Sequence, residues 1–168
     1  RDYLLKGYAL NQRMNRIENT VEHLADKVNE ISFQIKSNEI PSQGVFFDGQ
    51  IFDAYELTSK IIRSAKKSIV LIDNYIDEST LIHLSKKTKT VKVLLLTKNI
   101  TNQITLDVKK VNEQYGNFEL KTFAKSHDRF LIIDNSEVYH LGASLKDLGK
   151  KWFAFSRLDK KSVESILK

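Results

Sequence analysis

The chain has 168 residues, of which 41% are apolar and 29% charged, a globular composition that excludes disorder over the whole length. Lysine and arginine (27) exceed aspartate and glutamate (21) by a net charge of +6, and the absence of cysteine excludes disulfides and thiolate sites. The apolar runs are too short to span a bilayer and no signal peptide is visible, so we expect a cytoplasmic protein with no membrane partner.

Residues 1–37 predict a coiled-coil helix, because apolar residues recur at alternating spacings of four and three. β-branched residues at position a favour two parallel strands and hence a homodimer, whereas isoleucine at two d positions leaves a trimer open. Few ion pairs at e and g leave the orientation open, and the alternative is one amphipathic helix packed on its own domain. The a positions are Met14, Val21, Val28 and Ile35, and the d positions are Leu10, Ile17, Leu24 and Ile31.

Residues 38–43 contain the only proline, Pro41, and predict a linker that ends this helix. The chain has no initiator methionine and opens within the helical pattern, which indicates a piece of a longer protein. Acidic and basic groups balance over residues 1–43, so residues 44–168 carry the whole excess of +6. That excess suits a polyanion such as nucleic acid, and the alternative is a lysine-rich solvated surface.

Residues 44–168 alternate strand and helix patterns and then form a hairpin, which predicts an α/β sandwich with a mixed sheet. Glycine-rich phosphate loops of the usual spacings do not occur. We expect strands over 45–47, 68–73, 91–97, 118–123, 129–134, 137–141 and 152–156, and helices over 51–66, 78–87, 104–115 and 162–167.

The hairpin carries the side chains best suited to chemistry. His127 and Arg129 are two positions apart, so they share one face at the start of a strand. The return strand brings the small residues Gly142, Ala143 and Ser144 back to the same end. An imidazole, a cation and a hydroxyl then converge where a phosphate could sit, and the alternative is an ordinary hairpin with a capping histidine.

This segment resembles the phospholipase D superfamily, whose signature is His-x-Lys, four residues, Asp, and then a small-residue segment on the next strand. Here it reads His127-x-Arg129-x4-Asp134, followed by Leu141-Gly142-Ala143-Ser144. The resemblance covers about residues 44 to 156 and implies a phospholipase D-like mixed-sheet sandwich. Two positions depart from the signature, because Arg129 stands where lysine is usual and Ser144 where asparagine is usual. Arginine keeps the charge but is planar and larger.

A second resemblance is to RhuM-type virulence proteins and the phage-borne Bro/KilA-N-like regulators. It implies a missing N-terminal DNA-binding domain and says little about the C-terminal half. The segments that carry it are Tyr3-Leu4-Leu5-Lys6-Gly7-Tyr8-Ala9-Leu10-Asn11-Gln12-Arg13, Phe46-Phe47-Asp48-Gly49-Gln50 and Ile72-Asp73-Asn74-Tyr75-Ile76-Asp77.

Enzymes of the phospholipase D superfamily use two signature motifs per active site, and this chain has one, so the resemblance implies that two chains meet. One His127 would then attack phosphorus and form a phosphohistidine, and the second copy's His127 would protonate the leaving oxygen. Arg129 would neutralise the non-bridging oxygens, and Ser144 would donate a hydrogen bond to them.

The remaining acidic residues have less defined roles. Asp134 carries the signature carboxylate, and we expect it to hold the hairpin rather than to touch substrate. A carboxylate should orient the ring of His127, and Asp73 and Asp147 are the candidates. The family chemistry needs no cofactor and no metal, and no metal-ligand spacing appears in the sequence.

Three functions remain open. The first is a dimeric, metal-independent phosphodiesterase, specifically a nuclease. Nucleic acid is favoured over lipid as the substrate because the sequence shows no obvious membrane-inserting segment, and DNA and RNA are not distinguished. The second is a phospholipase D-like domain without turnover that binds phosphate or nucleic acid and dimerises a DNA-binding regulator. A pure oligomerisation domain is a third reading. Lys146, Lys150 and Lys151 could line a nucleic-acid groove or simply lie on the surface, and residues 152–155 are interpreted as a core strand rather than a stacking face.

Overall fold

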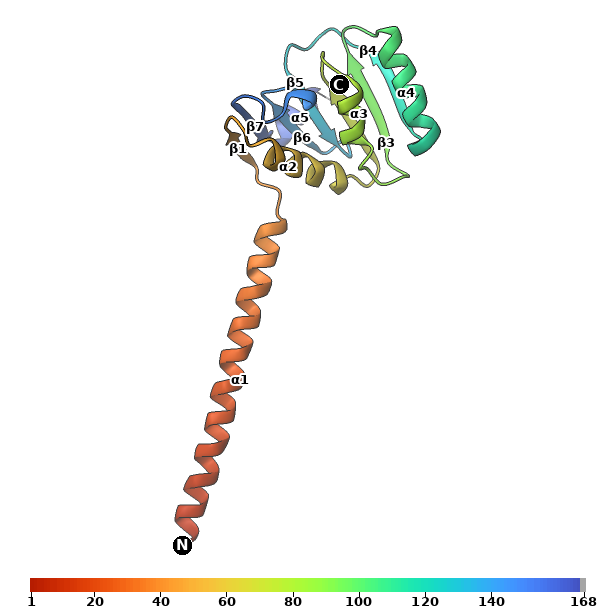
Figure 1. Cartoon of the computed structure of the whole chain (residues 1–168). Helices are drawn as coiled ribbons and strands as arrows, with labels where there is room; N and C mark the ends of the chain where they lie inside the picture. The colour runs from red at the N-terminus through yellow and green to blue at the C-terminus, as the bar shows by residue number, and fades with distance from the viewer. Residues whose placement is uncertain (167–168) are drawn as a thin grey trace. The chain divides into compact units, whose positions relative to one another are not determined.

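The computed structural model describes the backbone of residues 1–166 and the side chains of that range except 33–38, 160 and 163. The chain divides into two compact units, residues 1–39 and 40–168. The first unit is a single helix, α1 (Asp2–Asn38), and the second is an α/β unit (Figure 1). Each unit is considered by itself below.

Helix α1 confirms the predicted long N-terminal helix. Its seam residues from Leu10 to Ile31 are all between 52% and 60% exposed, so the helix by itself leaves the apolar stripe uncovered. The residues of the seven-residue repeat thus lie along one face of the helix, whereas the pairing of that face with a second helix stays a prediction. The predicted a position Ile35 lies outside the residues whose side chains are described.

The second unit alternates strands and helices as predicted. Within residues 40–166 the structure has one seven-stranded mixed sheet. Its strands are β1 (Gln43–Phe46), β2 (Ser68–Ile72), β3 (Lys92–Thr97), β4 (Phe118–Thr122), β5 (Arg129–Ile133), β6 (Glu137–Leu141) and β7 (Phe153–Arg157), and its helices are α2 (Ile51–Ser64), α3 (Glu78–Leu84), α4 (Asn102–Tyr115), the 3-10 turn η1 (Leu145–Asp147) and α5 (Lys160–Ile166).

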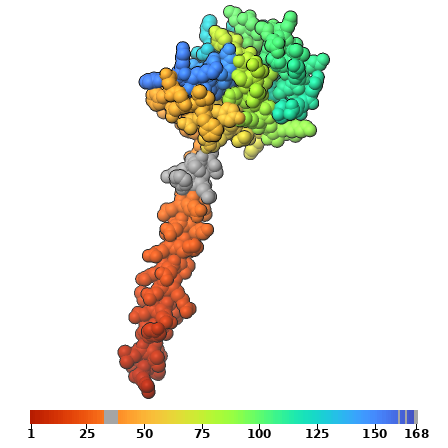
Figure 2. All heavy atoms as spheres, in the orientation of Figure 1, coloured from red at the N-terminus to blue at the C-terminus, as the bar shows by residue number. Residues whose placement is uncertain are grey.

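The strand order is β1-β7-β6-β5-β2-β3-β4. Strands β2, β3 and β4 are parallel, whereas β2, β5, β6, β7 and β1 pair antiparallel. Because β2 and β5 pair antiparallel, the end of β2 lies beside the start of β5. In the space-filling view the orange atoms of β1 and the blue atoms of β7 lie side by side, as their pairing requires (Figure 2).

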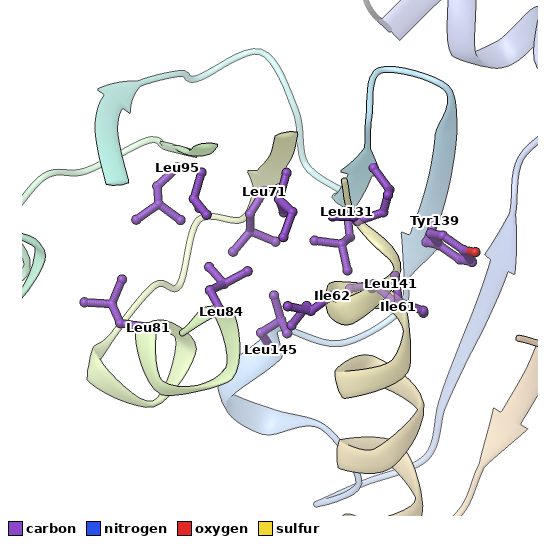
Figure 3. Close-up of a cluster of buried hydrophobic side chains, with 14 of the residues drawn as sticks. Ile61, Ile62, Leu71, Leu81, Leu84, Leu95, Leu131, Tyr139, Leu141 and Leu145 are labelled. Atoms are coloured by element: carbon purple, nitrogen blue, oxygen red, sulfur yellow. The ribbon is translucent and has the colours of Figure 1, made fainter. Parts of the chain in front are cut away.

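The core lies mainly on one face of the sheet. Apolar residues of α2, α3 and α4 pack there against alternate residues of the strands, and Leu71, Leu95 and Leu131 are completely buried (Figure 3). A smaller cluster on the other face joins Ile72, Ile132 and Val138 to Ile166 of α5. The mixed-sheet α/β sandwich predicted from the sequence is therefore confirmed.

Most element boundaries differ from the prediction by one to three residues, and two of these differences are described here. Helix α3 ends at Leu84 rather than 87, because the N–H groups of Lys86 and Lys87 bond to carbonyls three residues back and tighten the last turn. The last strand begins at Phe153 rather than 152, so Trp152 lies outside the sheet.

Asp134 closes the turn after β5. It has a positive φ of 53° and its carboxylate accepts hydrogen bonds from the backbone N–H groups of Lys66, Lys67 and Ser68 at 2.7–3.1 Å. Desolvation acts to raise the pKa of Asp134, but the three backbone bonds and the charge of Lys67 outweigh it, and the pKa is lowered. The carboxylate thus joins the β5–β6 hairpin to the start of β2.

We expect Asp134→Asn to lower the free energy of unfolding by about 1–3 kcal/mol at neutral pH, because it removes a charged acceptor of three N–H groups. Asparagine tolerates the positive φ, so the charge is the main change. The lowered pKa makes this stability fully present above the unfolded pKa of about 3.9 and lost as the pH falls through the folded value. Urea unfolding across acid pH tests this, with Glu113→Gln as the control; a deficit that does not shrink in acid would contradict it.

Candidate functional site

A pocket of about 620 Å³ opens where the end of β2, the start of β5 and the segment after β6 meet. It contains most of the residues that the sequence singled out. The volume lies within the ~300–1,000 Å³ that is usual for small-ligand sites. The lining residues are Tyr75, Arg129, Gly142, Ala143, Ser144, Lys146, Asp147, Lys150, Lys151 and Trp152.

Gly142 allows the small-residue segment to cross the end of the sheet. Its N–H donates to the carbonyl of Ala154 at 2.8 Å, and a Cβ at this position would lie 2.9 Å from that same oxygen. A larger residue would therefore push the chain away from β7. This close approach explains why small residues follow β6.

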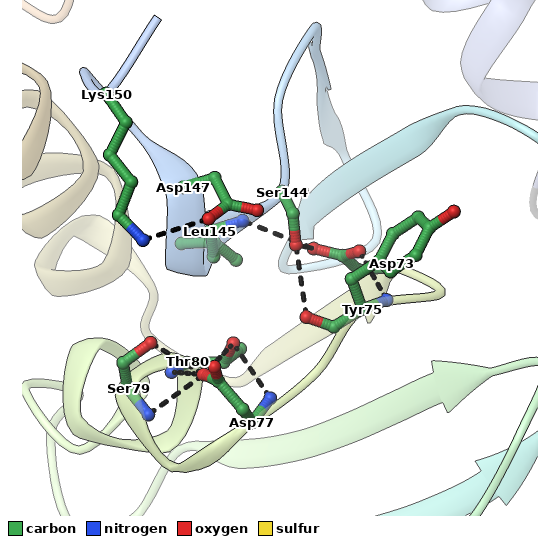
Figure 4. Close-up of polar contacts among 9 residues, drawn as sticks. All are labelled: Asp73, Tyr75, Asp77, Ser79, Thr80, Ser144, Leu145, Asp147 and Lys150. Carbon is green, nitrogen blue, oxygen red and sulfur yellow. Dashed lines mark hydrogen bonds and ion pairs between the residues drawn. The ribbon is translucent and has the colours of Figure 1, made fainter.

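Ser144 lies at the bottom of this segment and is 3% exposed. Its hydroxyl donates to the Asp73 carboxylate at 2.6 Å and lies 3.2 Å from the Tyr75 carbonyl oxygen. Asp73 is 1% exposed and also accepts from the backbone N–H groups of Leu145, at 3.2 Å, and Tyr75, at 2.9 Å (Figure 4). A hydroxyl has one proton to donate, so a Ser144 hydroxyl that donates to Asp73 has no proton left to donate to a phosphate.

Arg129 is one of the four cations that line the pocket. It is half-buried, and its guanidinium carbon lies 5.6 Å from the centroid of the Tyr75 ring. Lys146 approaches the same ring at 5.9 Å, and Lys150 bonds to Asp147 at 3.0 Å. The lining thus has four cations and one exposed carboxylate, a net charge of +3.

His127 is exposed and lies two residues before Arg129, outside the lining of the pocket. The preceding segment is held by Asn74, whose amide donates to the Ser126 carbonyl at 3.1 Å. Among the described residues, His127 makes no hydrogen bond or ion pair. Neither carboxylate considered for orienting its ring does so, since Asp73 is occupied by Ser144 and Leu145, and Asp147 by Lys150.

Asp134 is not brought to the pocket. It lies at the turn end of the β5–β6 hairpin, whereas Arg129 and the Gly142–Ser144 segment lie at the other end. The sequence had attached Asp134 to the same motif, and its described contacts are the backbone N–H groups of residues 66–68. Its position thus matches the expected role of holding the hairpin.

The other histidines lie elsewhere. His140 pairs with Asp128 at 3.6 Å, and His23 is exposed on α1. His83 is partly buried, and its ring centroid lies 5.0 Å from that of Tyr55. Burial lowers the pKa of His83, with Asp77 acting in the opposite direction. Among the described residues no group of three or more His, Asp or Glu could hold a metal ion.

Sequence reasoning missed Tyr75 and undervalued Trp152. Both line the pocket, and they are 56% and 69% exposed. The signal for Tyr75 was its place just after the buried strand 68–72, because side chains after neighbouring strand ends meet at one edge of a sheet. The signal for Trp152 was an aromatic residue directly after Lys150 and Lys151.

The structure is similar to several solved structures. NucT from Helicobacter pylori matches with a TM-score of 0.55 at 14% identity, over 74% of this chain and 90% of NucT. TrmBL2, an archaeal chromatin protein whose structure shows a novel mode of DNA binding, matches with a TM-score of 0.49 at 18% identity, over 94% of this chain and 62% of TrmBL2. Polyphosphate kinase from Porphyromonas gingivalis matches with a TM-score of 0.48 at 16% identity, over 76% and 22%.

No family model and no curated protein matches the chain. The likeness to NucT supports the predicted phospholipase D-like fold over 74% of this chain and extends to the fold alone. None of the described helices is both long and apolar enough to cross a membrane.

We expect Ser144→Ala to lower the free energy of unfolding by about 1–3 kcal/mol, because it removes one donor from a buried carboxylate. In a double-mutant cycle with Asp73→Asn, the two losses should not add, and the coupling energy should be about 0.5–3 kcal/mol. Urea unfolding measures all four forms. Ser85→Ala is the matched control, because the Ser85 hydroxyl donates to the Ile82 carbonyl and, among the described residues, to no other group. Additive losses would show that the two side chains do not act as a pair.

Proposed function

We propose that the C-terminal unit binds the phosphodiester backbone of nucleic acid and serves as the binding and dimerising module of a larger DNA-binding protein. The observation that carries this proposal is the pocket charge. Arg129, from the predicted phosphate site, lines the same pocket as Lys146, Lys150 and Lys151, and only one exposed carboxylate accompanies them. Clustered cations on one concave surface are the electrostatic footprint of a nucleic-acid contact.

The contacts favour binding over turnover. The Ser144 hydroxyl donates to Asp73 and so does not point its proton at a phosphate. No carboxylate among the described residues orients His127. Arg129 keeps the two properties that binding needs, a permanent charge and a planar group that pairs with two phosphate oxygens. These contacts therefore support binding of a phosphate ester more than its hydrolysis.

The exposed seam of α1 supports pairing with a second copy. The stripe from Leu10 to Ile31 repeats every seven residues, and its side chains are more than half exposed in the single chain. Burying such a stripe against an identical one removes apolar area from water on both helices, and a two-stranded coil is the arrangement we favour over a trimer. The resemblance to RhuM-type and Bro/KilA-N-like regulators adds the proposal of a DNA-binding domain before residue 1.

Replacing Arg129 tests the binding proposal. We expect Arg129→Ala to weaken binding of a DNA oligonucleotide about ten-fold at moderate salt and to reduce the slope of log affinity against log salt by about one. Fluorescence anisotropy with a labelled oligonucleotide measures both. The control is Lys109→Ala, which removes an exposed lysine of α4 outside the pocket. Equal losses for the two variants would reduce the effect to net charge and contradict a specific phosphate site.

A phosphodiesterase is the second candidate, and one observation favours it. His127 is exposed, makes no described hydrogen bond or ion pair, and lies two residues before Arg129 in the chain. In a paired form, one His127 would form a bond to phosphorus as the ester oxygen leaves, and the second copy's His127 would give that oxygen its proton. Water would then release the phosphate and regenerate the imidazole.

If the chain cleaves nucleic acid in this way, cleavage should persist in EDTA and should require both the imidazole and the paired helices. We expect His127→Ala to remove EDTA-resistant cleavage, and Leu24→Lys to remove it together with the dimer seen by analytical ultracentrifugation, because a lysine in the seam is buried without a partner. Glu22→Lys, off the seam, is the control. Absence of EDTA-resistant cleavage of single-stranded DNA, duplex DNA and RNA by the dimer would reject the enzyme and leave the binding function.

A further inference from the structure

Two aromatic rings are exposed in the pocket alongside its cations. Tyr75 and Trp152 are 56% and 69% exposed, and both line the same 620 Å³ space. They come from segments 77 positions apart in the chain, so only the fold brings them to one site. Large exposed rings inside a pocket point to a ligand that covers them.

The fold holds both rings in place. The backbone N–H of Tyr75 donates to Asp73 at 2.9 Å, and its carbonyl oxygen lies 3.2 Å from the Ser144 hydroxyl. Trp152 packs edge-on against Phe47, with ring centroids 4.8 Å apart and planes at 90°. These contacts fix the backbone of Tyr75 and the orientation of the Trp152 ring. A flat ligand would therefore bind rings that are already ordered, which lowers the entropic cost of binding.

The cations lie close enough for one ligand to use both features. Arg129 and Lys146 approach the Tyr75 ring at 5.6 Å and 5.9 Å. A phosphate on Arg129 therefore lies next to an aromatic ring, and a nucleotide is the common ligand that joins a phosphate to a flat ring. Stacking on aromatic side chains is sequence-tolerant, since every base has a π face.

We propose that this pocket binds an unpaired nucleotide, with its phosphate on Arg129 and its base stacked on Trp152 or Tyr75. The inference rests on the proposed function and narrows it to single-stranded nucleic acid or a nucleotide end, because the bases of a duplex are stacked on each other and present no free face. The exposed fractions of these side chains also correct the interpretation of residues 152–155 as a core strand. Phe153 and Phe155 are core residues as expected, but Trp152 is not.

Tryptophan fluorescence follows contact of a ligand with Trp152 directly, because Trp152 is the only tryptophan in the chain. The full chain is titrated with a single-stranded thymidine oligonucleotide, an abasic oligonucleotide of equal length and phosphate number, and the corresponding duplex, while tryptophan fluorescence and anisotropy are recorded. We expect the thymidine strand to quench Trp152 and to bind roughly ten-fold tighter than the abasic strand, as one stacked base implies. The duplex should bind without quenching.

Two substitutions separate stacking from charge. Tyr75→Ala and Trp152→Ala should lower affinity for the thymidine strand but leave abasic binding unchanged, and Tyr75→Phe, which keeps the ring, should behave as the unmodified chain. Tyr115→Ala removes an exposed tyrosine at the end of α4 and is the matched control. Thermal unfolding of each variant verifies that it is folded. Quenching by thymidine monophosphate alone would identify a free nucleotide as sufficient, and its absence would identify a strand.

The outcomes separate the two proposals. If the abasic and thymidine strands bind equally and Trp152 is not quenched, the nucleotide inference is wrong while phosphate binding stands. If neither strand binds, the proposed function itself is wrong. Tighter binding of the duplex than of the single strand would also overturn the inference, because base faces would then contribute nothing.

Discussion

The pocket depends on one buried carboxylate. Asp73 directly follows β2, which pairs with β3 along one edge and with β5 along the other, and Asp73 is 1% exposed. A charge in that position is costly unless it is hydrogen-bonded. The donors come from Ser144 and Leu145, about seventy residues later, together with the backbone of Tyr75. The hydrogen bonds to Asp73 therefore join the segment after β2 to the segment after β6, and residues of both segments line the pocket.

A second carboxylate secures the other end of the same hairpin. Asp134 accepts three backbone N–H groups from residues 66–68, so β5 is fixed at its far end while the Asp73 network fixes the segment that follows β6. The strand between them has its inward side chain Leu131 completely buried. Arg129 thus projects from a strand that is anchored by hydrogen bonds and packing. A binding group on such a support loses little freedom when it meets an anion, which favours affinity.

The local pattern of the sequence was enough to predict the strands, the helices and the hairpin end that carries Arg129, because side-chain periodicity and turns depend on neighbouring residues. It was also enough for the small-residue segment, whose need for Gly142 is set by the approach of Ala154. It was not enough for the partner of Ser144. That hydroxyl was expected to face a phosphate, and it faces Asp73 because the fold brings two distant segments together. For the same reason Tyr75 was missed, and Trp152 was assigned to a strand that begins one residue later.

An arginine at position 129 suits a pocket whose lining includes an exposed aromatic ring. A lysine at position 129 would offer a point charge, whereas a guanidinium can lie against an aromatic ring and pair with two oxygens at once. The Arg129 guanidinium approaches the Tyr75 ring, and that ring also faces Lys146. The proposed hydrolysis would need an oriented imidazole and a free donor, whereas the Ser144 hydroxyl donates to Asp73. The proposed binding would need a cation beside a flat surface, and the Arg129 guanidinium lies 5.6 Å from the Tyr75 ring.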